Sequence, residues 1–229
     1  HRPELHIKAF TAVELDYMFR KAKLSIEEGL RELVEAGMQS LPGGGAEIFH
    51  PDIRQKIAAD KVDADGWLKI HETAHKLGLH SNATMLYGHV ESYADRVDHL
   101  LRLREAQDET GGFQAFVPLA FQPKNSGLSD LPPTSGIDDL KTVAVARLLL
   151  DSFPHIKAYW VMLGLKIAQT ALFFGADDMD GTVVEEVISL LSDAGHGQAV
   201  AKAELVRVIR DAGRTPVERS TTYRILRRF

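Results

Sequence analysis

The chain has 229 residues, a formal net charge of −5 at pH 7 and no cysteine. This length is enough to bury one large core, so a single α/β domain is the simplest account. Acidic and basic residues are interspersed, which argues against nucleic acid or a membrane surface as a partner. Without cysteine these residues contain no disulfide, thiolate nucleophile or cysteine-bound metal, and we expect a cytoplasmic protein.

The apolar runs and the first residues of the chain lead to two further expectations. No apolar run approaches the roughly 20 residues that a membrane-spanning helix needs. The first residue is His1 rather than Met, and a strand pattern already begins at Leu5. We therefore expect a fragment that is truncated on its N-terminal side.

The first third of the chain alternates between strand and helix patterns. Residues 5–10 alternate as in a strand, with His6 and Lys8 on one face. Two capping boxes then predict two helices that end by Gly37: Thr11 with Glu14, and Ser25 with Glu28. A strand with a glycine turn is predicted at 38–49, followed by helices at 51–58 and 65–77.

The middle of the chain centres on residues 81–91, which predict a strand that stops at Gly88. The helix that follows, 90–107, has an apolar face that we expect to point inward: Val90, Tyr93, Ala94, Val97, Leu100 and Leu101. A strand at 113–121 and a loop at 122–137 come next, and loops of that length are usually functional or mobile. A helix at 138–151 follows, with Leu140, Val143, Ala144, Leu148 and Leu149 expected inward.

The last third continues the alternation. Strands are predicted at 156–162 and 173–176, and helices at 163–172, 182–194 and 198–212, before a basic tail. Six strand–helix alternations predict a parallel sheet. Because a complete (β/α)₈ barrel takes roughly 250 residues, we expect a TIM-type (β/α) barrel with about six of its eight units and a helical extension at about 182–229. The alternative is a doubly wound sheet, although no GxGxxG motif supports it.

Three short motifs suggest chemistry. His71 and His75 form an HExxH pattern, which is typical of zinc peptidases but also arises by chance on a solvated helix. Asp178 and Asp180 resemble part of a calcium loop, but the alignment puts Ala176 at the first ligand position. These acids, with Asp177, follow the predicted strand at 173–176, where barrels carry their sites.

The third motif is the glycine turn that follows the strand at 38–49. Glycines allow a ligand to approach the backbone, and free amides there can bind an anion. The turn lacks the Lys-Ser/Thr pair of a nucleotide-binding P-loop. A plain tight turn is an equally good interpretation of the pattern alone.

Longer segments resemble a known family. PGGGAEIF, WxxxHxxAHKLG, SNATMLYGHVE and QDETGGFQAFVPLAFQP are similar to the radical S-adenosylmethionine enzymes of the futalosine route to menaquinone. HIKAYWVM, FGADDMDGTVVEE and GRTPVERSTTY are most similar to the aminofutalosine (aminodeoxyfutalosine) synthases within that group. The resemblance runs from about Leu5 to the C-terminus and implies a (β/α) barrel.

The resemblance also implies a reaction. In that family a [4Fe-4S] cluster, held by CxxxCxxC, reduces S-adenosylmethionine to a 5′-deoxyadenosyl radical. The radical adds to 3-[(1-carboxyvinyl)oxy]benzoate, and loss of the carboxylate carbon gives 6-amino-6-deoxyfutalosine. An electron donor such as flavodoxin or ferredoxin is implied. Because CxxxCxxC is absent from these residues, we expect this chain alone to bind no cluster and to be inactive.

The resemblance assigns residues as well. S-adenosylmethionine is expected at two strand ends: Gly43, Gly44, Gly45 and Glu47 at the first, and Thr84, Leu86, Gly88 and Glu91 at the second. Thr84 replaces a glycine of the family pattern. The residues near the benzoate are suggested by chemistry and not by the resemblance, because its two carboxylates need cations or hydroxyls and the radical needs a dry cavity. We expect them to be His6, Lys8, Phe121, Gln122, Tyr159, Asp177 and Asp178.

Alternatives stay open at this stage. Gln122 stands where this subfamily is expected to have His and where the cyclic dehypoxanthine futalosine synthase has Gln. That enzyme and the deazaflavin-forming synthases are therefore alternatives. A zinc peptidase built on His71 and His75, or a non-catalytic binding module, would belong to other classes of protein.

Overall fold

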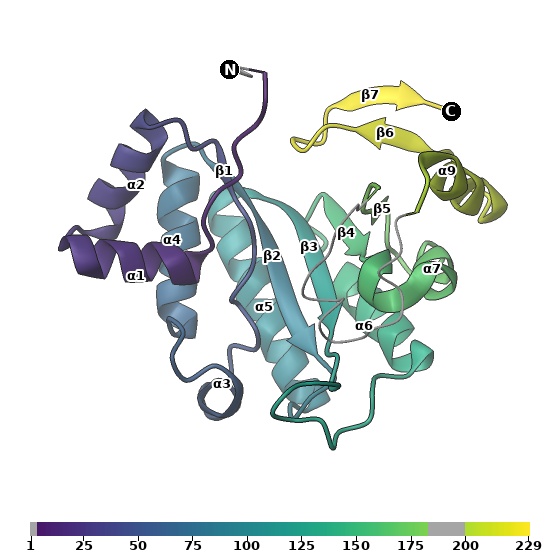
Figure 1. Ribbon diagram of the computed structural model, residues 1–229, viewed down its shortest axis with the longest axis horizontal. Coiled ribbons are helices and arrows are strands. Elements are labelled where there is room, and N and C mark those ends of the chain that lie inside the picture. The colour runs from purple at the N-terminus through teal and green to yellow at the C-terminus, as the bar shows by residue number, and fades with distance from the viewer. Residues whose placement is uncertain (1–3, 183–199) are drawn as a thin grey trace. The chain divides into compact units, whose positions relative to one another are not determined.

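The computed structural model describes residues 4–182 and 200–229 (Figure 1). The chain divides into two compact units. Unit 1 comprises His1–Met85, Glu91–Phe116 and Ser152–Pro154, and unit 2 comprises Leu86–Val90, Val117–Asp151 and His155–Phe229. The predicted helix at 182–194 lies almost wholly outside the described residues, as does the start of the helix predicted at 198–212.

Unit 1 begins with two helices whose N-termini were predicted correctly. α1 (Ala12–Ala22) and α2 (Ile26–Glu35) both start with the expected capping boxes, on Thr11 and Ser25. The strand predicted at 5–10 is reduced to one parallel bridge between Lys8 and Ser40. The sequence pattern therefore located a parallel pairing of this segment correctly, but it overstated the length of the strand.

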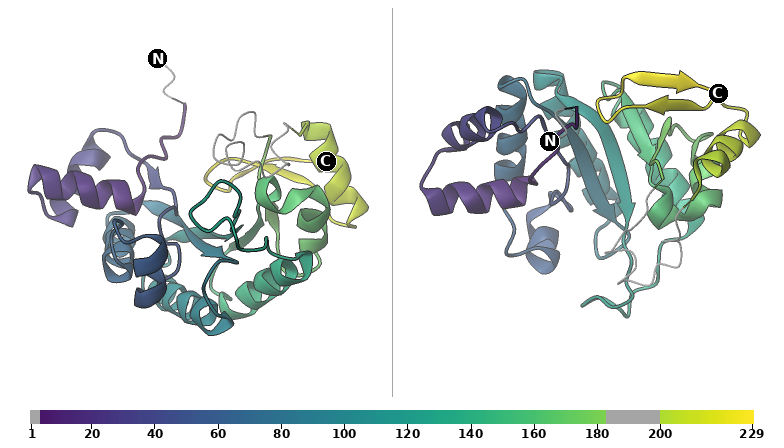
Figure 2. Two further views of the ribbon diagram at one scale, coloured as in Figure 1. Left: turned by 60° about the horizontal axis from the view of Figure 1, so that its bottom comes forward. Right: turned by 45° about the horizontal axis from the view of Figure 1, so that its top comes forward.

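The rest of unit 1 is a strand–helix alternation. Its elements are β1 (Ser40–Leu41), α3 (Pro51–Ile57), α4 (Ala64–Lys76), β2 (His80–Tyr87), α5 (Tyr93–Thr110) and β3 (Phe113–Ala120), of which the ends of β2 and β3 belong to unit 2. β1 is parallel to β2, with Ser40 opposite His80. α4 and α5 lie on the same face of these strands (Figure 2). Between the helices and the strands, the Phe49 ring packs on Trp67 at 5.6 Å and on His99 at 3.9 Å.

The inward face of α5 differs from the prediction. Tyr93 is 63% exposed, and Val97 and Leu101 are also exposed. The helix instead buries a polar set together with leucines and an alanine: Arg96, His99, Leu100, Leu103, Ala106 and Gln107. The cause is specific hydrogen bonding, because His99 Nε2 lies 2.9 Å from the carbonyl of Thr84 and Gln107 bonds to the backbone of Phe113. Hydrophobic periodicity alone contains no information about such bonds.

Unit 2 continues with α6 (Gly136–Leu149), β4 (His155–Ala158), α7 (Trp160–Ala171) and β5 (Asp178–Met179). β4 and β5 are parallel, with Lys157 opposite Asp178. The strand predicted at 156–162 was too long, because Tyr159 caps α7 and the helix begins at Trp160. Leu148, expected inward on α6, is 77% exposed.

Two further predictions in unit 2 were wrong. Residues 173–175 form turns, and the strand begins only at Asp178, so Asp177 precedes β5 and Asp178 opens it, and neither follows the strand. The C-terminal segment is not wholly helical. After α9 (Lys202–Asp211) it forms an antiparallel hairpin of β6 (Val217–Arg219) and β7 (Ile225–Arg228).

The strand order decides between the two predicted architectures. The five-stranded sheet has the order β1-β2-β3-β4-β5, so neighbours in the sheet are also neighbours in sequence. A doubly wound sheet would reverse its order at a switch point. The order therefore agrees with the predicted incomplete (β/α) barrel. Within the part of the chain that the structure describes, no helix is both long enough and apolar enough to span a membrane.

Candidate functional site

The glycine turn after β1 is held in place by side chains that bind its carbonyl groups. Thr84 Oγ1, on β2, donates to the carbonyl of Gly43 at 2.6 Å. Trp67 Nε1, on α4, donates to the carbonyl of Gly44 at 3.2 Å. Both donors are buried. The next two carbonyls of the turn also accept from a side chain, and that donor is a single arginine.

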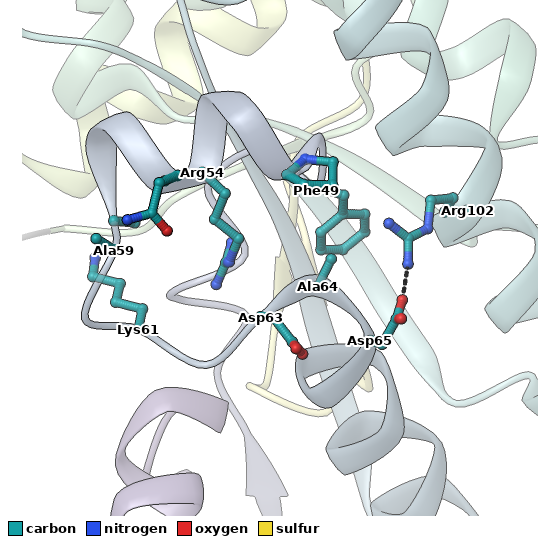
Figure 3. A pocket seen from close by; sticks show the side chains of 11 residues that line it. Phe49, Arg54, Ala59, Lys61, Asp63, Ala64, Asp65 and Arg102 are labelled. Carbon is teal, nitrogen blue, oxygen red and sulfur yellow. Dashed lines mark hydrogen bonds and ion pairs between the residues drawn. The ribbon is translucent and has the colours of Figure 1, made fainter.

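Arg54, on α3, reaches back to this turn. Its Nη1 donates to the carbonyl of Ala46 at 2.5 Å, and its Nη2 donates to the carbonyl of Gly45 at 2.9 Å. The guanidinium also donates to the carbonyl of Val62, which precedes α4. Figure 3 shows Arg54 pointing from α3 into a pocket of about 280 Å³ that is lined by α3, α4 and α5.

The conformation of the turn requires glycine. A Cβ on Gly43 would lie 2.6 Å from the backbone oxygen of Asn82, and Gly45 has a φ of +85°. Glu47 adopts a φ of +49°, which is unusual for a residue with a side chain. Its carboxylate lies 2.6 Å from Lys61 Nζ. The amides of 44–47 donate to no acceptor within the described residues.

Unit 1 holds two more of the predicted residues at the end of β2. Thr84 is buried and acts through the Gly43 carbonyl. The Glu91 side chain is fully buried and pairs with Arg96 Nε at 2.8 Å. The Arg96 guanidinium also lies 5.0 Å from the centre of the Tyr93 ring. This carboxylate is therefore fixed in place by the first turn of α5.

His6 and Lys8, predicted to bind the benzoate, lie beside the start of β1. His6 Nε2 is 2.8 Å from Ser40 Oγ, and Lys8 forms the bridge to Ser40. Burial and then the charge of Lys8 lower the pKa of His6, which favours the neutral imidazole. The two side chains thus lie close together, as the shared strand face predicted.

In unit 2, the end of β2 is a tight turn. Gly88 has a φ of +89°, and a Cβ there would lie 2.1 Å from Thr134 Cγ2. The amide of Val90 donates to His89 Nδ1 at 2.7 Å, so the other ring nitrogen carries the proton and donates to the carbonyl of Leu86 at 3.1 Å. These bonds fix the predicted Leu86–Gly88 segment.

Phe121 and Gln122 continue from β3 next to this turn. The amide of Phe121 donates to the carbonyl of Tyr87 at 2.8 Å, and the Phe121 ring meets His89 edge-on at 5.9 Å. Gln122 Nε2 donates weakly to the carbonyl of Ala120 at 3.3 Å. Unit 2 therefore brings Leu86, Gly88, Phe121 and Gln122 together, and Tyr159 is the N-cap of α7.

Asp178 is engaged by other side chains. Arg219 Nε and Nη2 donate to its carboxylate at 2.8 and 2.6 Å, and Tyr223 donates its hydroxyl at 2.9 Å. Lys157 Nζ lies 3.7 Å away and is bonded more closely to Asp180, at 2.7 Å. The carboxylate thus anchors the C-terminal hairpin to β4 and β5.

Asp177 is engaged in the same way. Arg147 and His155 each bind its carboxylate at 2.7 Å, and the amide of Ile156 donates at 2.8 Å. Burial opposes ionisation, but the bonds from His155 and Ile156 outweigh it and lower the pKa of Asp177. These partners account for both carboxylates without a ligand.

The HExxH pair is built into the core of unit 1. Thr110 donates its proton to the carbonyl of Ala106, so His75 Nδ1–H donates to Thr110 Oγ1 at 2.7 Å. The Ser81 hydroxyl then donates to His75 Nε2 at 2.7 Å and accepts from His71 Nδ1 at 2.8 Å.

Both ring nitrogens of His75 are hydrogen-bonded and His71 is fully buried, so the two histidines have no exposed lone pairs to bind zinc. Burial lowers the pKa of His75 to about 4 and holds the pKa of His71 well below its ordinary value. Among the described residues no group of three or more His, Asp or Glu is placed to hold a metal ion. The zinc-peptidase alternative therefore has no support in the geometry.

Comparison with known proteins identifies the family. Residues 110–228 match the family model described as the CofH/MqnC C-terminal region, which is more than half of the chain. The chain belongs to the CofH/MqnC family. This confirms the group of enzymes to which the sequence motifs pointed.

Curated relatives align with nearly the whole chain. It is 51% identical to an aminodeoxyfutalosine synthase of Thermus thermophilus over 98% of its length, and 47% identical to one of Streptomyces coelicolor over 99%. It is 43% identical, over 96%, to a 5-amino-6-(D-ribitylamino)uracil--L-tyrosine 4-hydroxyphenyl transferase of Methanopyrus kandleri. The chain spans only 61–62% of the length of these three relatives.

A solved structure supports the fold. The crystal structure of methylornithine synthase (PylB) matches with a TM-score of 0.55 and 17% identity, over 81% of this chain and 59% of that one. At this identity the match shows the fold alone. Together with the strand order, it confirms an incomplete (β/α) barrel.

The sequence pointed to the glycine turn and to Thr84, but it missed the two other side chains that hold the turn. Arg54 and Trp67 each lie in an ordinary amphipathic helix pattern, and neither stands out from it. The one signal in the sequence is an arginine that follows the glycine turn within the next predicted helix, and its burial is seen only in the structure. Its meaning depends on distances that the pattern does not contain.

Proposed function

We propose that this chain is part of a radical S-adenosylmethionine enzyme of menaquinone biosynthesis. The whole protein would transfer the 5′-deoxyadenosyl group of S-adenosylmethionine to 3-[(1-carboxyvinyl)oxy]benzoate to give 6-amino-6-deoxyfutalosine. Two aminodeoxyfutalosine synthases at 51% and 47% identity support this choice. The protein would be a transferase.

The observation that carries the proposal is the glycine turn. Its carbonyls from Gly43 to Ala46 all accept from side chains, whereas the amides that follow them donate to no acceptor among the described residues. Free amides with glycine access suit a ligand with acceptor oxygens. S-adenosylmethionine carries such oxygens on its ribose and its methionyl carboxylate. We assign Gly43, Gly44, Gly45 and Glu47 to that contact.

The remaining predicted site residues are assigned to the adenine, to the substrate or to support of the site. Leu86 and Gly88 of unit 2 would contact the adenine, as the family resemblance implies. Thr84 acts by holding Gly43, and Glu91 is held by Arg96. Lys8 and His6 are the candidates for the substrate carboxylates. Phe121, Gln122 and Tyr159 would help to exclude water from the reactive radical.

The iron–sulfur cluster does not fit this chain. Reductive cleavage of S-adenosylmethionine to a radical needs such a cluster and a low-potential electron donor, such as flavodoxin or ferredoxin. The 229 residues contain no cysteine, so they supply no thiolate to a cluster. In the proposal, cluster binding belongs to a part of the protein beyond these residues.

A second candidate follows from the methanogen relatives. Several are 5-amino-6-(D-ribitylamino)uracil--L-tyrosine 4-hydroxyphenyl transferases, with identities of 43% and 41% among the first of them. These values are close enough to those of the futalosine enzymes to keep that reaction as the alternative.

One experiment separates the two reactions. The full-length gene product is purified anaerobically, its cluster is reconstituted, and it is incubated with S-adenosylmethionine, a reductant and either the benzoate or L-tyrosine with the ribitylaminouracil. Mass spectrometry is expected to detect 6-amino-6-deoxyfutalosine in the first incubation. Product only in the second would replace the proposal with the alternative, and product in neither would contradict both.

A further inference from the structure

The direction of the amides in the glycine turn follows from its carbonyls. No peptide bond in the described residues is cis. In a trans peptide, the N–H of a residue points opposite to the carbonyl of the residue before it. Because the carbonyls of Gly45 and Ala46 both face the guanidinium of Arg54, the amides of Ala46 and Glu47 both face away from it.

The backbone angles agree with this arrangement. Gly45 and Glu47 have φ values of +85° and +49°, whereas Ala46 between them does not have a positive φ. A change in the sign of φ between neighbouring residues is a feature that this turn shares with anion-binding nests, in which successive N–H groups face a common side. One arginine therefore holds the backbone from behind while the amides point to the opposite side.

Arg54 is an unusual residue for this place. It is 5% exposed, and its acceptors are all main-chain carbonyls, those of Gly45, Ala46 and Val62. No ion pair joins it to a carboxylate within the described residues. Burial lowers the pKa of Arg54, while the more distant charges of Glu47 and Asp63 oppose that effect. A buried cation without a paired carboxylate is costly, and an apolar side chain of similar size would avoid that cost.

Arg102 provides an internal comparison, because it lines the same pocket (Figure 3). Its guanidinium pairs with Asp65, whose side chain is 90% exposed, and it lies 5.1 Å from the centre of the Phe49 ring. It donates to no carbonyl of the glycine turn. The two arginines therefore share a pocket but differ in whether they hold the turn.

We propose that Arg54 is a positioning residue for S-adenosylmethionine: by binding the carbonyls of Gly45 and Ala46, it directs the amides of Ala46 and Glu47 toward acceptor oxygens of the ligand. This inference rests on the proposed function, because it takes the glycine turn as the S-adenosylmethionine site. It adds a residue on α3 that faces the back of the turn and has no contact with the ligand.

The test uses the full-length, cluster-reconstituted protein and three variants: Arg54→Lys, Arg54→Met and Arg102→Met. Calorimetry measures the Kd for S-adenosylmethionine, turnover gives KM and kcat, and thermal unfolding monitors the fold. We expect Arg54→Met to weaken S-adenosylmethionine binding by about tenfold or more, with a matching rise in KM and a smaller change in kcat. Arg102→Met is expected to stay within about twofold of wild type.

Arg54→Lys separates positioning from charge and bulk. A single ammonium lacks the planar fork that binds two carbonyls at once, so we expect this variant to keep most of the thermal stability but to bind S-adenosylmethionine weakly. If Arg54→Lys folds and binds the ligand as tightly as wild type, the positioning role is excluded. If it unfolds together with Arg54→Met, Arg54 is a stability residue and the inference also fails.

The same measurements distinguish a failure of the proposed function from a failure of the role of Arg54. A wild-type protein that does not bind S-adenosylmethionine contradicts the proposed function. A wild-type protein that binds it, with Arg54→Met binding equally well, contradicts only the role of Arg54.

Discussion

The glycine turn of unit 1 and the acidic cluster of unit 2 use polar groups in opposite ways. In unit 1, Arg54, Trp67 and Thr84 bind backbone carbonyls and leave the amides on the other side available. In unit 2, the carboxylates are already hydrogen-bonded by other side chains: Asp178 by Arg219 and Tyr223, and Asp177 by Arg147 and His155.

The difference separates a candidate site from a structural network. A site keeps unused hydrogen-bonding groups for its ligand, whereas a network satisfies its own groups. Both segments drew attention in the sequence for the same reason, as polar or glycine-rich residues near a strand end. Only the contacts in the structure show that the carboxylates of Asp177 and Asp178 are already hydrogen-bonded to other side chains.

The largest expected effect comes from breaking the acidic cluster. Asp178→Ala leaves the partly buried Arg219 guanidinium and the Tyr223 hydroxyl without the carboxylate that binds them, whereas Lys157 keeps its bond to Asp180. Removing one member of a buried pair is expected to lower the free energy of unfolding by about 3 kcal/mol. Urea denaturation measures it. As a control, Asp211→Ala removes an exposed pair with Arg207 and is expected to change stability by less than about 0.5 kcal/mol. A fully stable Asp178→Ala protein that fails to bind the benzoate would restore Asp178 as a site residue.

A glycine substitution tests the turn after β2 in the same way. Gly88→Ala combines a φ of +89° with a Cβ that collides with Thr134, whereas Gly78→Ala has a similar φ of +84° and open space around the added Cβ. We expect Gly78→Ala to cost about 1 kcal/mol and Gly88→Ala about 1 kcal/mol more, because Thr134 must move. Equal losses in thermal denaturation would mean that the contact with Thr134 is not tight.

A smaller effect is expected from the turn after β1. Thr84→Val keeps the shape of the side chain but leaves the Gly43 carbonyl without its donor. We expect a loss of about 1–2 kcal/mol in urea denaturation. Thr73→Val removes a similar bond to the Lys69 carbonyl on an exposed helix face and is expected to change stability by less than about 0.5 kcal/mol. A Thr84→Val protein as stable as wild type would show that the Gly43 carbonyl does not need this bond.

The histidine relay of unit 1 predicts a pH dependence. In the folded chain burial lowers the pKa of His75 to about 4, below its ordinary 6.5, so between these values the unfolded chain binds more protons. Stability should therefore be complete above pH 6.5 and fall as the pH drops toward 4, by about 1.4 kcal/mol per pH unit for this one group. Urea denaturation at several pH values is expected to give a shallower dependence of stability on pH for His75→Gln than for wild type. Equal slopes for wild type and His75→Gln would exclude a buried neutral His75.

Particular residues show which features of the fold and the site can be predicted from the sequence. Capping boxes at Thr11 and Ser25 were located correctly, because they depend on residues three apart. The start of β5 was predicted too early. Phe173 and Phe174 are residues typical of a strand, but they lie in the turns that follow α7 and are exposed. The role of Arg54 was not predictable, because its partners depend on tertiary contacts.

In our proposal S-adenosylmethionine lies on the amide side of the glycine turn. Hydrogen–deuterium exchange of the reconstituted full-length protein, with and without S-adenosylmethionine, measures the protection of these amides. We expect slower exchange on ligand binding in the peptide that covers 43–49, and no change around the exposed turn at Gly111. Confirmed ligand binding with unchanged exchange across 43–49 would contradict it.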